Sequence, residues 1–423
     1  MEKLIQYLYY LSILCFALPS GDILNIPVKI LVTFGILFLF LASRLIEKKP
    51  IVIDGVVKGF ILILAALVLW ACLGMLNGYD TVFMALKSFL SLLVTVLTSY
   101  LMITNHIVTE KKAMKVICFT AVIMVGFKFL CEFVLMAGIL DWVQFRQLYV
   151  LVTGTNITTM QIPFGGMIIY RLMATNDYLP LVLIGFYLLY EKTSAWKKAV
   201  IIAALGVYTF IVYSRVAMLQ YGVIVLFYIG SLLWDFLKHA TRKRTLIFTV
   251  FVAGVLSIVV LAFALKSDMI ISTITTFAES MYERWFGNSA EYSDSFRVEQ
   301  KVYLWEGIWK TPVIGQGLGS YIRGYLRSTV VPFSYEAEYL SFIYQFGFVG
   351  FVLIIGGILA IFAKICFAQT KRNRMRLLVL LNFGIWAVRP LYNPQFLSSS
   401  SGMIIVAIFL AASYYSKSLE LKR

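Results

Sequence analysis

Long apolar runs separated by short polar segments dominate the chain. A helix that crosses the hydrocarbon core of a bilayer needs roughly 20 apolar residues, and most of the runs approach that length. The pattern predicts about twelve membrane-spanning helices. They cover residues 4–18, 28–43, 59–76, 82–103, 114–139, 178–190, 199–213, 216–234, 246–265, 339–362, 377–388 and 402–415. The sequence therefore predicts an all-α polytopic membrane protein, with residues 1–423 as a single integral membrane domain.

The composition agrees with this pattern. Of the 423 residues, 61% are hydrophobic and 14% are charged, and the mean hydropathy is +0.87. A soluble domain is nearer half apolar and about a quarter charged. Lipid is therefore the expected solvent for much of the chain. The five cysteines lie in or beside apolar runs without metal-ligand spacing, so we expect neither a disulfide framework nor a metal site from them.

Lysine and arginine gather in every second segment between the predicted spans. If the N-terminus is cytoplasmic, these basic segments are all cytoplasmic, as the positive-inside rule requires. The basic clusters are Arg44, Lys48, Lys49 and Lys58; Lys111, Lys112 and Lys115; Lys192, Lys197 and Lys198; Lys238, Arg242, Lys243 and Arg244; and Lys364, Lys371, Arg372, Arg374 and Arg376. The net charge of +16 then reflects membrane topology rather than nucleic-acid binding. We predict an inner-membrane protein with both termini cytoplasmic and with the first span retained rather than cleaved.

Two of the predicted outer segments are long. Residues 140–177 include the Gly- and Thr-rich stretch VTGTNITTMQIPFGG, which we expect to be partly re-entrant. Residues 266–338 form a large extracytoplasmic loop between the ninth and tenth spans, and a loop of that length usually has a function or a structure of its own. Within it we predict an amphipathic interfacial helix that begins near Arg297. Its apolar stripe is Val298, Val302, Trp305 and Trp309, and the glycines that follow it are expected to form turns.

The outer segments contain neither histidine nor cysteine, because His106 and His239 are both predicted to be cytoplasmic. Ser-His-Asp triads and His/Cys zinc sites are therefore excluded there. The outer segments instead carry arginines at or near span ends. Arginine suits bidentate binding of phosphate, and a lipid pyrophosphate headgroup lies at this depth. The arginines are Arg171, Arg215, Arg297 and Arg389. Taken singly, Arg215 also fits a snorkelling interfacial residue, and Arg297 also fits a solvated surface charge.

Two acidic residues, Glu336 and Glu338, precede the tenth span. Each fits either an ordinary acidic residue that the helix dipole favours at a helix N-terminus or a general base held at the membrane surface. Lys128 and Glu132 lie four residues apart inside the fifth span and can pair on one helix face. Intramembrane charges are candidates for function, and a purely structural pair, or contact with interfacial water, fits these two residues as well.

Three segments combine into a larger pattern. YSRVAMLQYGVIVLF places Ser-Arg at the head of a span, and FRVEQKVYLWEGIWKTPVIGQGLGSY places Arg, then Trp, before a Pro and Gly-x-Gly element. EAEYLSFIYQFGFVG ends in Gly-x-x-Gly at Gly347 and Gly350. In this order and spacing they resemble motifs of the O-antigen polymerase and ligase superfamily, most clearly over residues 176–350, and ATNDYLPL is similar to its Asn-bearing element. Glu336 occupies the position where the ligases carry histidine.

The resemblance implies a membrane glycosyltransferase that moves a glycan from its polyprenyl pyrophosphate to an acceptor hydroxyl on the outer face. Because Glu336 replaces the ligase histidine, a Wzy-type polymerase fits better than a ligase. The product is then an O-antigen, a capsule or an exopolysaccharide. Arg215 and Arg297 are expected to stabilise charge on the leaving phosphate, and Glu336 to act as the base. The substrate-binding candidates are Arg389, Arg171, Glu338 and Arg323.

The expected reaction inverts the anomeric centre and needs no metal or other cofactor. The expected partners are membrane lipid, the polyprenyl-pyrophosphate-linked oligosaccharide as both donor and acceptor, and a possible chain-length regulator protein; nucleic acid is not expected. Two other functions stay open. One is a ligase that transfers the glycan to lipid A core or to another surface acceptor, and the other is a lipid-glycan flippase or transporter. The short central inner segment EKTSAWKK and the large outer loop argue against transport.

Overall fold

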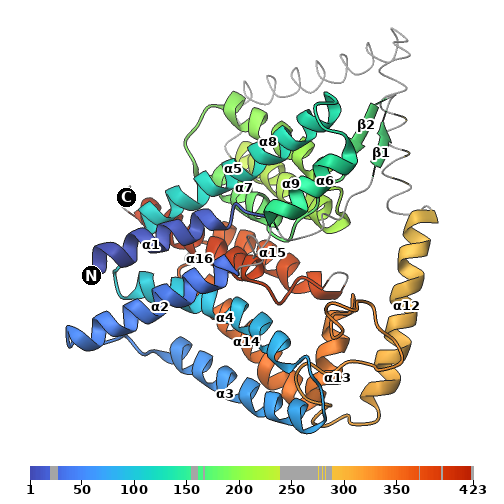
Figure 1. The fold of residues 1–423 in the computed structure, drawn as a ribbon. Coiled ribbons are helices and arrows are strands. Elements are labelled where there is room, and N and C mark those ends of the chain that lie inside the picture. The colour runs from blue at the N-terminus through green and yellow to red at the C-terminus, as the bar shows by residue number, and fades with distance from the viewer. Residues whose placement is uncertain are drawn as a thin grey trace.

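The computed structural model describes residues 1–19, 27–153, 161–164, 167–238, 288–370, 372–391 and 394–420, together with the single positions 275, 279 and 282. Long helices packed side by side dominate this part of the chain (Figure 1). The all-α polytopic prediction is confirmed for it, apart from one small hairpin. The predicted ninth span, residues 246–265, and His239 lie outside the described residues.

The helices of the first half are α1 (Glu2–Cys15), α2 (Val28–Ile46), α3 (Gly55–Leu76), α4 (Val82–Thr104), α5 (Glu110–Met136), α6 (Trp142–Thr153), α7 (Tyr178–Tyr190), α8 (Ala195–Val212) and α9 (Arg215–Lys238). Those of the second half are α12 (Asn288–Ile308), α13 (Glu338–Phe351), α14 (Gly357–Phe367), α15 (Asn373–Val388) and α16 (Ser399–Glu420). A π-helical turn, η1 (Val352–Gly356), joins α13 to α14, and a 3-10 turn, η2 (Arg389–Leu391), follows α15.

Within the described residues, 8 helices are long and apolar enough to cross a membrane, with α13 and α14 counted as one. They coincide with the predicted second to fifth, seventh, eighth, tenth and twelfth spans. Helices α1, α7 and α15 fall on the predicted first, sixth and eleventh spans but have 14, 13 and 16 residues. Membrane crossing by these three shorter helices stays a prediction.

The basic segments meet at one end of the bundle. The two chain termini lie at this end (Figure 1). There Lys49 forms an ion pair with Glu2 at 3.1 Å, and Lys417 forms one with Glu110 at 2.8 Å. Segments that the charge pattern assigns to one side of the membrane therefore contact each other in space. That this side is the cytoplasm stays a prediction.

The opposite end of the bundle holds the Gly-rich segment, which packs against the connection between α3 and α4. Thr81 donates from its hydroxyl to the backbone oxygen of Gly319 at 2.5 Å. Gly317 has a φ of +94°, and a Cβ there would lie 2.2 Å from the backbone nitrogen of Gly74. Only glycine fits such a close approach in this backbone conformation. The predicted turns are confirmed. They bring the backbone of Gly317 against the end of α3.

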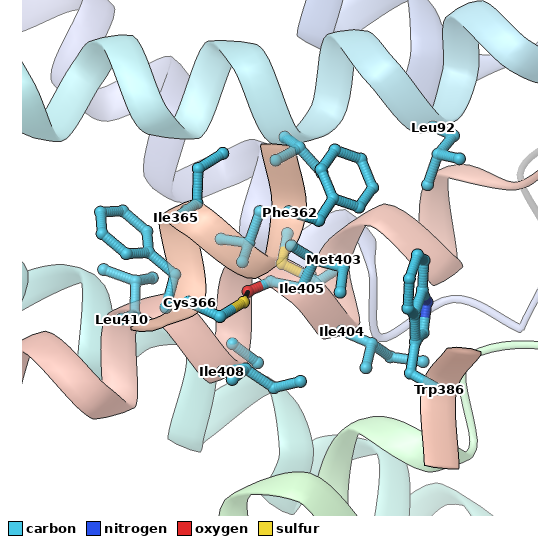
Figure 2. Packing of buried hydrophobic residues seen from close by; sticks show 14 of the residues in the cluster. Leu92, Phe362, Ile365, Cys366, Trp386, Met403, Ile404, Ile405, Ile408 and Leu410 are labelled. Atoms are coloured by element: carbon cyan, nitrogen blue, oxygen red, sulfur yellow. Dashed lines mark hydrogen bonds between the residues drawn. The ribbon is translucent and has the colours of Figure 1, made fainter. Parts of the chain in front are cut away.

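The core lies around α16, which contacts α4, α5, α7, α14 and α15. Residues 400–413 are all buried. Trp386 of α15 packs on Phe396 with ring centroids 5.0 Å apart and donates to the Ser401 hydroxyl at 2.8 Å. Figure 2 shows Trp386, Phe362 and Cys366 gathered around residues of α16. Because lipid tails are as apolar as a protein core, this close packing, rather than the hydrophobic effect, is what holds membrane helices together.

Residues 140–177, expected to be partly re-entrant, contain α6 and a hairpin of β1 (Gln161–Phe164) and β2 (Met167–Tyr170). The strands are antiparallel, with Gln161 opposite Tyr170. Trp142 stacks on the Tyr170 ring at 5.1 Å. The all-α prediction overlooks this hairpin because four-residue strands are too short to give an alternating signal. Residues 154–160 and 165–166 of the same stretch lie outside the described residues.

Helix α12 lies at the edge of the molecule beside α13 (Figure 1). It covers the segment in which a helix was expected, but it begins at Asn288, so Arg297 lies in its middle rather than at its start. The error arises because the Ser and Asp residues before Arg297, which usually favour helix starts, continue the helix here. The predicted apolar stripe is exposed, with Val298 at 61% and Val302 at 51%, as an interfacial position requires. That residues 266–338 are extracytoplasmic stays a prediction.

Candidate active site

A carboxylate held by two arginines lies beside α12. Glu336, just before α13, accepts a hydrogen bond on Oε2 from Nε of Arg297 at 2.6 Å and one on Oε1 from Nη2 of Arg327 at 3.2 Å. The backbone N–H of Glu336 donates to Oε1 of Gln300 at 2.8 Å. Hydrogen bonds between charged groups are stronger than neutral ones, so the carboxylate is fixed in place. Glu336, Arg297 and Arg327 are termed the Glu336 clamp.

The Glu336 clamp borders an open cavity of about 440 Å³. The cavity is lined by Phe296, Glu299, Gln300, Tyr325, Leu326, Arg327 and Glu336. The Glu336 side chain is 20% exposed, so a substrate group can reach it. An ionised carboxylate has about four acceptor positions, and the two arginines occupy one on each oxygen. Glu336 can therefore accept a further hydrogen bond, or a proton, from a hydroxyl in the cavity.

Tyr335 fixes the loop that carries Glu336. Its hydroxyl accepts a hydrogen bond from the backbone N–H of Ile322 at 2.9 Å and donates to the backbone oxygen of Tyr325 at 3.1 Å. Burial raises the pKa of Tyr335 to about 12, so the hydroxyl keeps its proton at neutral pH and stays a donor. The buried ring thus ties the loop before α13 to the wall of the cavity and positions the residue that follows it.

A second group of cationic residues lies near Tyr178, the first residue of α7. The guanidinium carbon of Arg389 lies 3.6 Å from the centre of the Tyr178 ring, and the hydroxyls of Tyr178 and Ser214 are 3.1 Å apart. Arg215 follows Ser214 and begins α9. Arg171 lies within electrostatic range of Tyr178. Arg171, Arg215, Arg389 and Tyr178 are termed the Tyr178 cluster.

The Tyr178 cluster is more buried than the sequence suggests. Arg389 is 3% exposed, which corrects the prediction of an outward-facing guanidinium at a span end. Among the described residues its Nε and Nη1 atoms have no hydrogen-bond partner, and neither has the buried Nε of Arg171. Burial lowers the pKa of Arg171 from its ordinary value, while Tyr178 and Asp177 oppose this shift. Buried N–H groups without acceptors are costly, and an anionic ligand would satisfy them.

Glu338, predicted to bind substrate at the membrane surface, is buried. It is 6% exposed and accepts a hydrogen bond from the backbone N–H of Phe396 at 2.9 Å. Arg389 lies within electrostatic range. The segment before α16 packs over Glu338, but it is distant in the sequence. The sequence alone therefore gives no sign of this cover and suggests a surface position. Its contacts fix the start of α13 to the segment that precedes α16.

Lys128 and Glu132 do not pair with each other, so that prediction is wrong. Lys128 forms its ion pair with Asp177 at 2.9 Å. Glu132 accepts the backbone N–H of Tyr170 at 2.9 Å. The i, i+4 spacing allows a local pair, but a buried tertiary partner prevails. Lys128 therefore holds the residue directly before Tyr178 and supports the Tyr178 cluster from α5.

Arg323, the remaining substrate-binding candidate, lies apart from both groups. It is exposed, and its guanidinium carbon is 5.5 Å from the centre of the Tyr79 ring. The predicted residues thus occupy three places. The structure joins Arg297 to Glu336 directly and places Arg389 and Arg171 near Tyr178. Arg215 is next in the chain to Ser214, which contacts Tyr178, and Arg323 lies beside a separate cavity.

Sequence reasoning misses Arg327, Gln300 and Tyr178. Arg327 lies in an irregular loop where no periodicity singles it out. Its position nine residues before Glu336 is the signal that could have found it, because a short loop can bring such residues together. Gln300 and Tyr178 look like ordinary residues of a helix and a span, and only the tertiary fold gives them polar partners.

Comparison with known families matches residues 199–355 to the family described as O-antigen ligase. The match includes Arg215, Arg297, Arg323, Arg327, Glu336 and Glu338, and it leaves out Arg171, Tyr178 and Arg389. No curated protein matches the chain. The matched segment contains the complete Glu336 clamp together with most of α8 and all of α9, α12 and α13. Residues 199–355 are therefore similar to a family of glycosyl-transferring enzymes, and the chain is an all-α polytopic membrane protein.

Proposed function

We propose that the chain polymerises polyprenyl-pyrophosphate-linked oligosaccharide repeat units on the outer face of a bacterial inner membrane. The observation that carries the proposal is the Glu336 clamp, in which an accessible carboxylate is held at a cavity by Arg297 at 2.6 Å and Arg327 at 3.2 Å. A fixed carboxylate with free acceptor positions is suited to take a proton from a sugar hydroxyl.

The Tyr178 cluster is the proposed site for the donor pyrophosphate. Buried guanidinium groups offer several N–H donors in a medium of low dielectric, where their effect on a phosphate anion is larger than in water. The unpartnered Nε and Nη1 of Arg389 and Nε of Arg171, among the described residues, support this role. Glu338 links the Glu336 clamp to the Tyr178 cluster, since it lies two residues after Glu336 and within electrostatic range of Arg389.

In the proposed reaction a hydroxyl of the acceptor repeat unit attacks the anomeric carbon of the donor. The bond between that carbon and the pyrophosphate oxygen breaks as the new glycosidic bond forms, so the anomeric centre inverts. The hydroxyl proton passes to Glu336, and the bonding electrons pass to the leaving pyrophosphate. Arginine stabilises the negative charge that develops there. Because pyrophosphate is a stable leaving group, the reaction places little demand on acid catalysis.

The residue at position 336 favours a polymerase over a ligase. The resemblance to the ligases puts their histidine at this position, and this chain carries glutamate. A carboxylate paired with two arginines differs from a histidine in charge and in hydrogen-bonding pattern. The acceptor of this chain is thus proposed to be a second lipid-linked repeat unit rather than lipid A core.

Deletion of the gene, followed by analysis of surface polysaccharide and lipid-linked glycan, tests the proposal. We expect single repeat units at the surface and no polymer. Polymer that accumulates on its lipid carrier would instead indicate a ligase. Failure of lipid-linked repeats to reach the outer face would indicate a flippase. The same strain complemented with the wild-type gene is the control.

A further inference from the structure

A second cavity adjoins the one at the Glu336 clamp. It has a volume of about 380 Å³. Its lining residues include Tyr79, Tyr303, Tyr321, Tyr344, Arg323 and Glu306. Tyr303 of this cavity stacks on Tyr325 of the first one, with ring centroids 4.7 Å apart and planes 27° apart. The two tyrosines form a shared wall, so a molecule that reaches Glu336 can extend past them into the second cavity.

One face of α12 lines both cavities. Glu299 borders the first, while Tyr303, Glu306 and Lys310 border the second. Glu299, Tyr303 and Glu306 are spaced four and three residues apart and so lie on one side of the helix, while Lys310 follows the end of the helix at Ile308. From Glu299 to Glu306 the helix axis rises roughly 10 Å, which is longer than one sugar ring and suits an oligosaccharide. The apolar stripe with Val298 and Val302 is exposed elsewhere on the same helix.

The second cavity has the side chains that carbohydrate-binding sites use. The C–H groups of a sugar ring pack against aromatic faces, and its hydroxyls need donors and acceptors nearby. Tyr303 is 40% exposed, so part of its ring is open despite the contact with Tyr325. The cavity lining also includes the amide of Gln316 and the charged groups of Glu306, Lys310 and Arg323.

Arg323 is placed to recognise the ligand rather than to stabilise the fold. Its guanidinium lies over Tyr79, and its Nη2 makes only a long contact of 3.5 Å with the backbone oxygen of Asn77. Among the described residues it has no ion-pair partner. Its donors therefore remain largely available to hydroxyl or carboxylate groups of a glycan.

We propose that this second cavity, with Tyr303 and Arg323 as its main contacts, binds the sugars next to the one whose hydroxyl reacts at Glu336. This subsite rests on the proposed function, because it gives the acceptor oligosaccharide a track along α12. It also explains why the outer loop carries a second group of aromatic residues away from the Glu336 clamp. Tyr303 and Arg323 would then determine which repeat unit the enzyme accepts.

Direct binding tests this subsite without any turnover. The probe is the free oligosaccharide released by mild acid from the lipid-linked repeats of the deletion strain, titrated onto the purified full-length protein in detergent and followed by saturation-transfer NMR. We expect Tyr303→Ala and Arg323→Gln each to weaken binding about tenfold. Tyr303→Phe, which keeps the ring, and Val302→Ala, on the exposed stripe of the same helix, should bind like the wild type.

Wild-type binding by both Tyr303→Ala and Arg323→Gln would overturn the subsite. Arg323 is exposed, so its variant does not disturb the core and keeps the test decisive if Tyr303→Ala folds poorly. The variant Glu336→Gln separates the two proposals, because it should bind the probe normally while its rate of polymer formation falls strongly. Bound probe without polymer formation by the wild-type protein would contradict the proposed function alone. Polymer formation with an unchanged KM in the Tyr303 and Arg323 variants would contradict the subsite alone.

Discussion

Nε of Arg297, in the middle of α12, lies 2.6 Å from Oε2 of Glu336, the residue two positions before α13 begins. This contact joins the edge helix of the outer loop to the helix that returns the chain into the membrane. Both side chains are partly exposed, at 17% and 20%, and they border one cavity. A surface pair of this kind contributes little to stability. Its proposed role is to position the carboxylate of Glu336 at the cavity.

Removal of Arg297 should lower activity by releasing that carboxylate. Arg297→Ala leaves Glu336 with Arg327 alone, and a hydrogen bond to a charged group is worth about 1.5–3 kcal/mol. We expect a loss of polymer formation on the order of tenfold to a hundredfold, with a normal level of protein in the membrane. The measurement is the rate of polymer formation in membranes of the deletion strain. Activity equal to the wild type would show that the ion pair does not position Glu336.

The Tyr178 cluster predicts a strict need for arginine at position 215. Arg215→Lys keeps the charge but loses the planar fork that matches phosphate. We expect strong loss of polymer at normal protein level, read from surface polysaccharide on gels and from immunoblots of the membrane fraction. Full-length polymer from both Arg215→Lys and Arg215→Ala would rule out pyrophosphate binding by this arginine.

Glu338 should affect stability rather than chemistry. Glu338→Leu leaves the buried N–H of Phe396 without its acceptor, which costs about 1–3 kcal/mol. We therefore expect a lower thermal midpoint of the purified protein in detergent. Glu338→Gln keeps an acceptor oxygen and is the matched variant, with a midpoint near that of the wild type. Equal midpoints for the leucine variant and the wild type would contradict the structural role.

The side assignments can be checked with single cysteines. In a background without the five native cysteines, Thr329→Cys lies in the outer loop and Lys192→Cys lies in the connection between α7 and α8; both native side chains are exposed. An impermeant thiol reagent applied to intact spheroplasts should label the cysteine at position 329 and spare that at 192. The opposite pattern would invert the membrane topology proposed for every segment.

Local patterns predict the helices of this chain well and their polar contacts poorly. Hydropathy places a described helix at each predicted span other than the ninth, since the length of an apolar run depends only on neighbouring residues. The resemblance indicates both Arg297 and Glu336, yet nothing in the sequence shows that they touch. Lys128 illustrates the failure, because its spacing from Glu132 suggests a local pair while the fold supplies Asp177. Partners distant in sequence depend on the packing of helices.

Glu336 as the base is the central claim, and Glu336→Gln tests it most directly. Glutamine keeps the size and most of the hydrogen bonding but takes no proton from the acceptor hydroxyl. The measurement is the rate of polymer formation by purified protein in proteoliposomes supplied with lipid-linked repeat units, with Asp80→Asn, an exposed carboxylate at the same end of the bundle, as control. We predict a loss of roughly 10²–10⁴-fold for Glu336→Gln and none for the control. Polymer formation by Glu336→Gln at the wild-type rate would contradict the account.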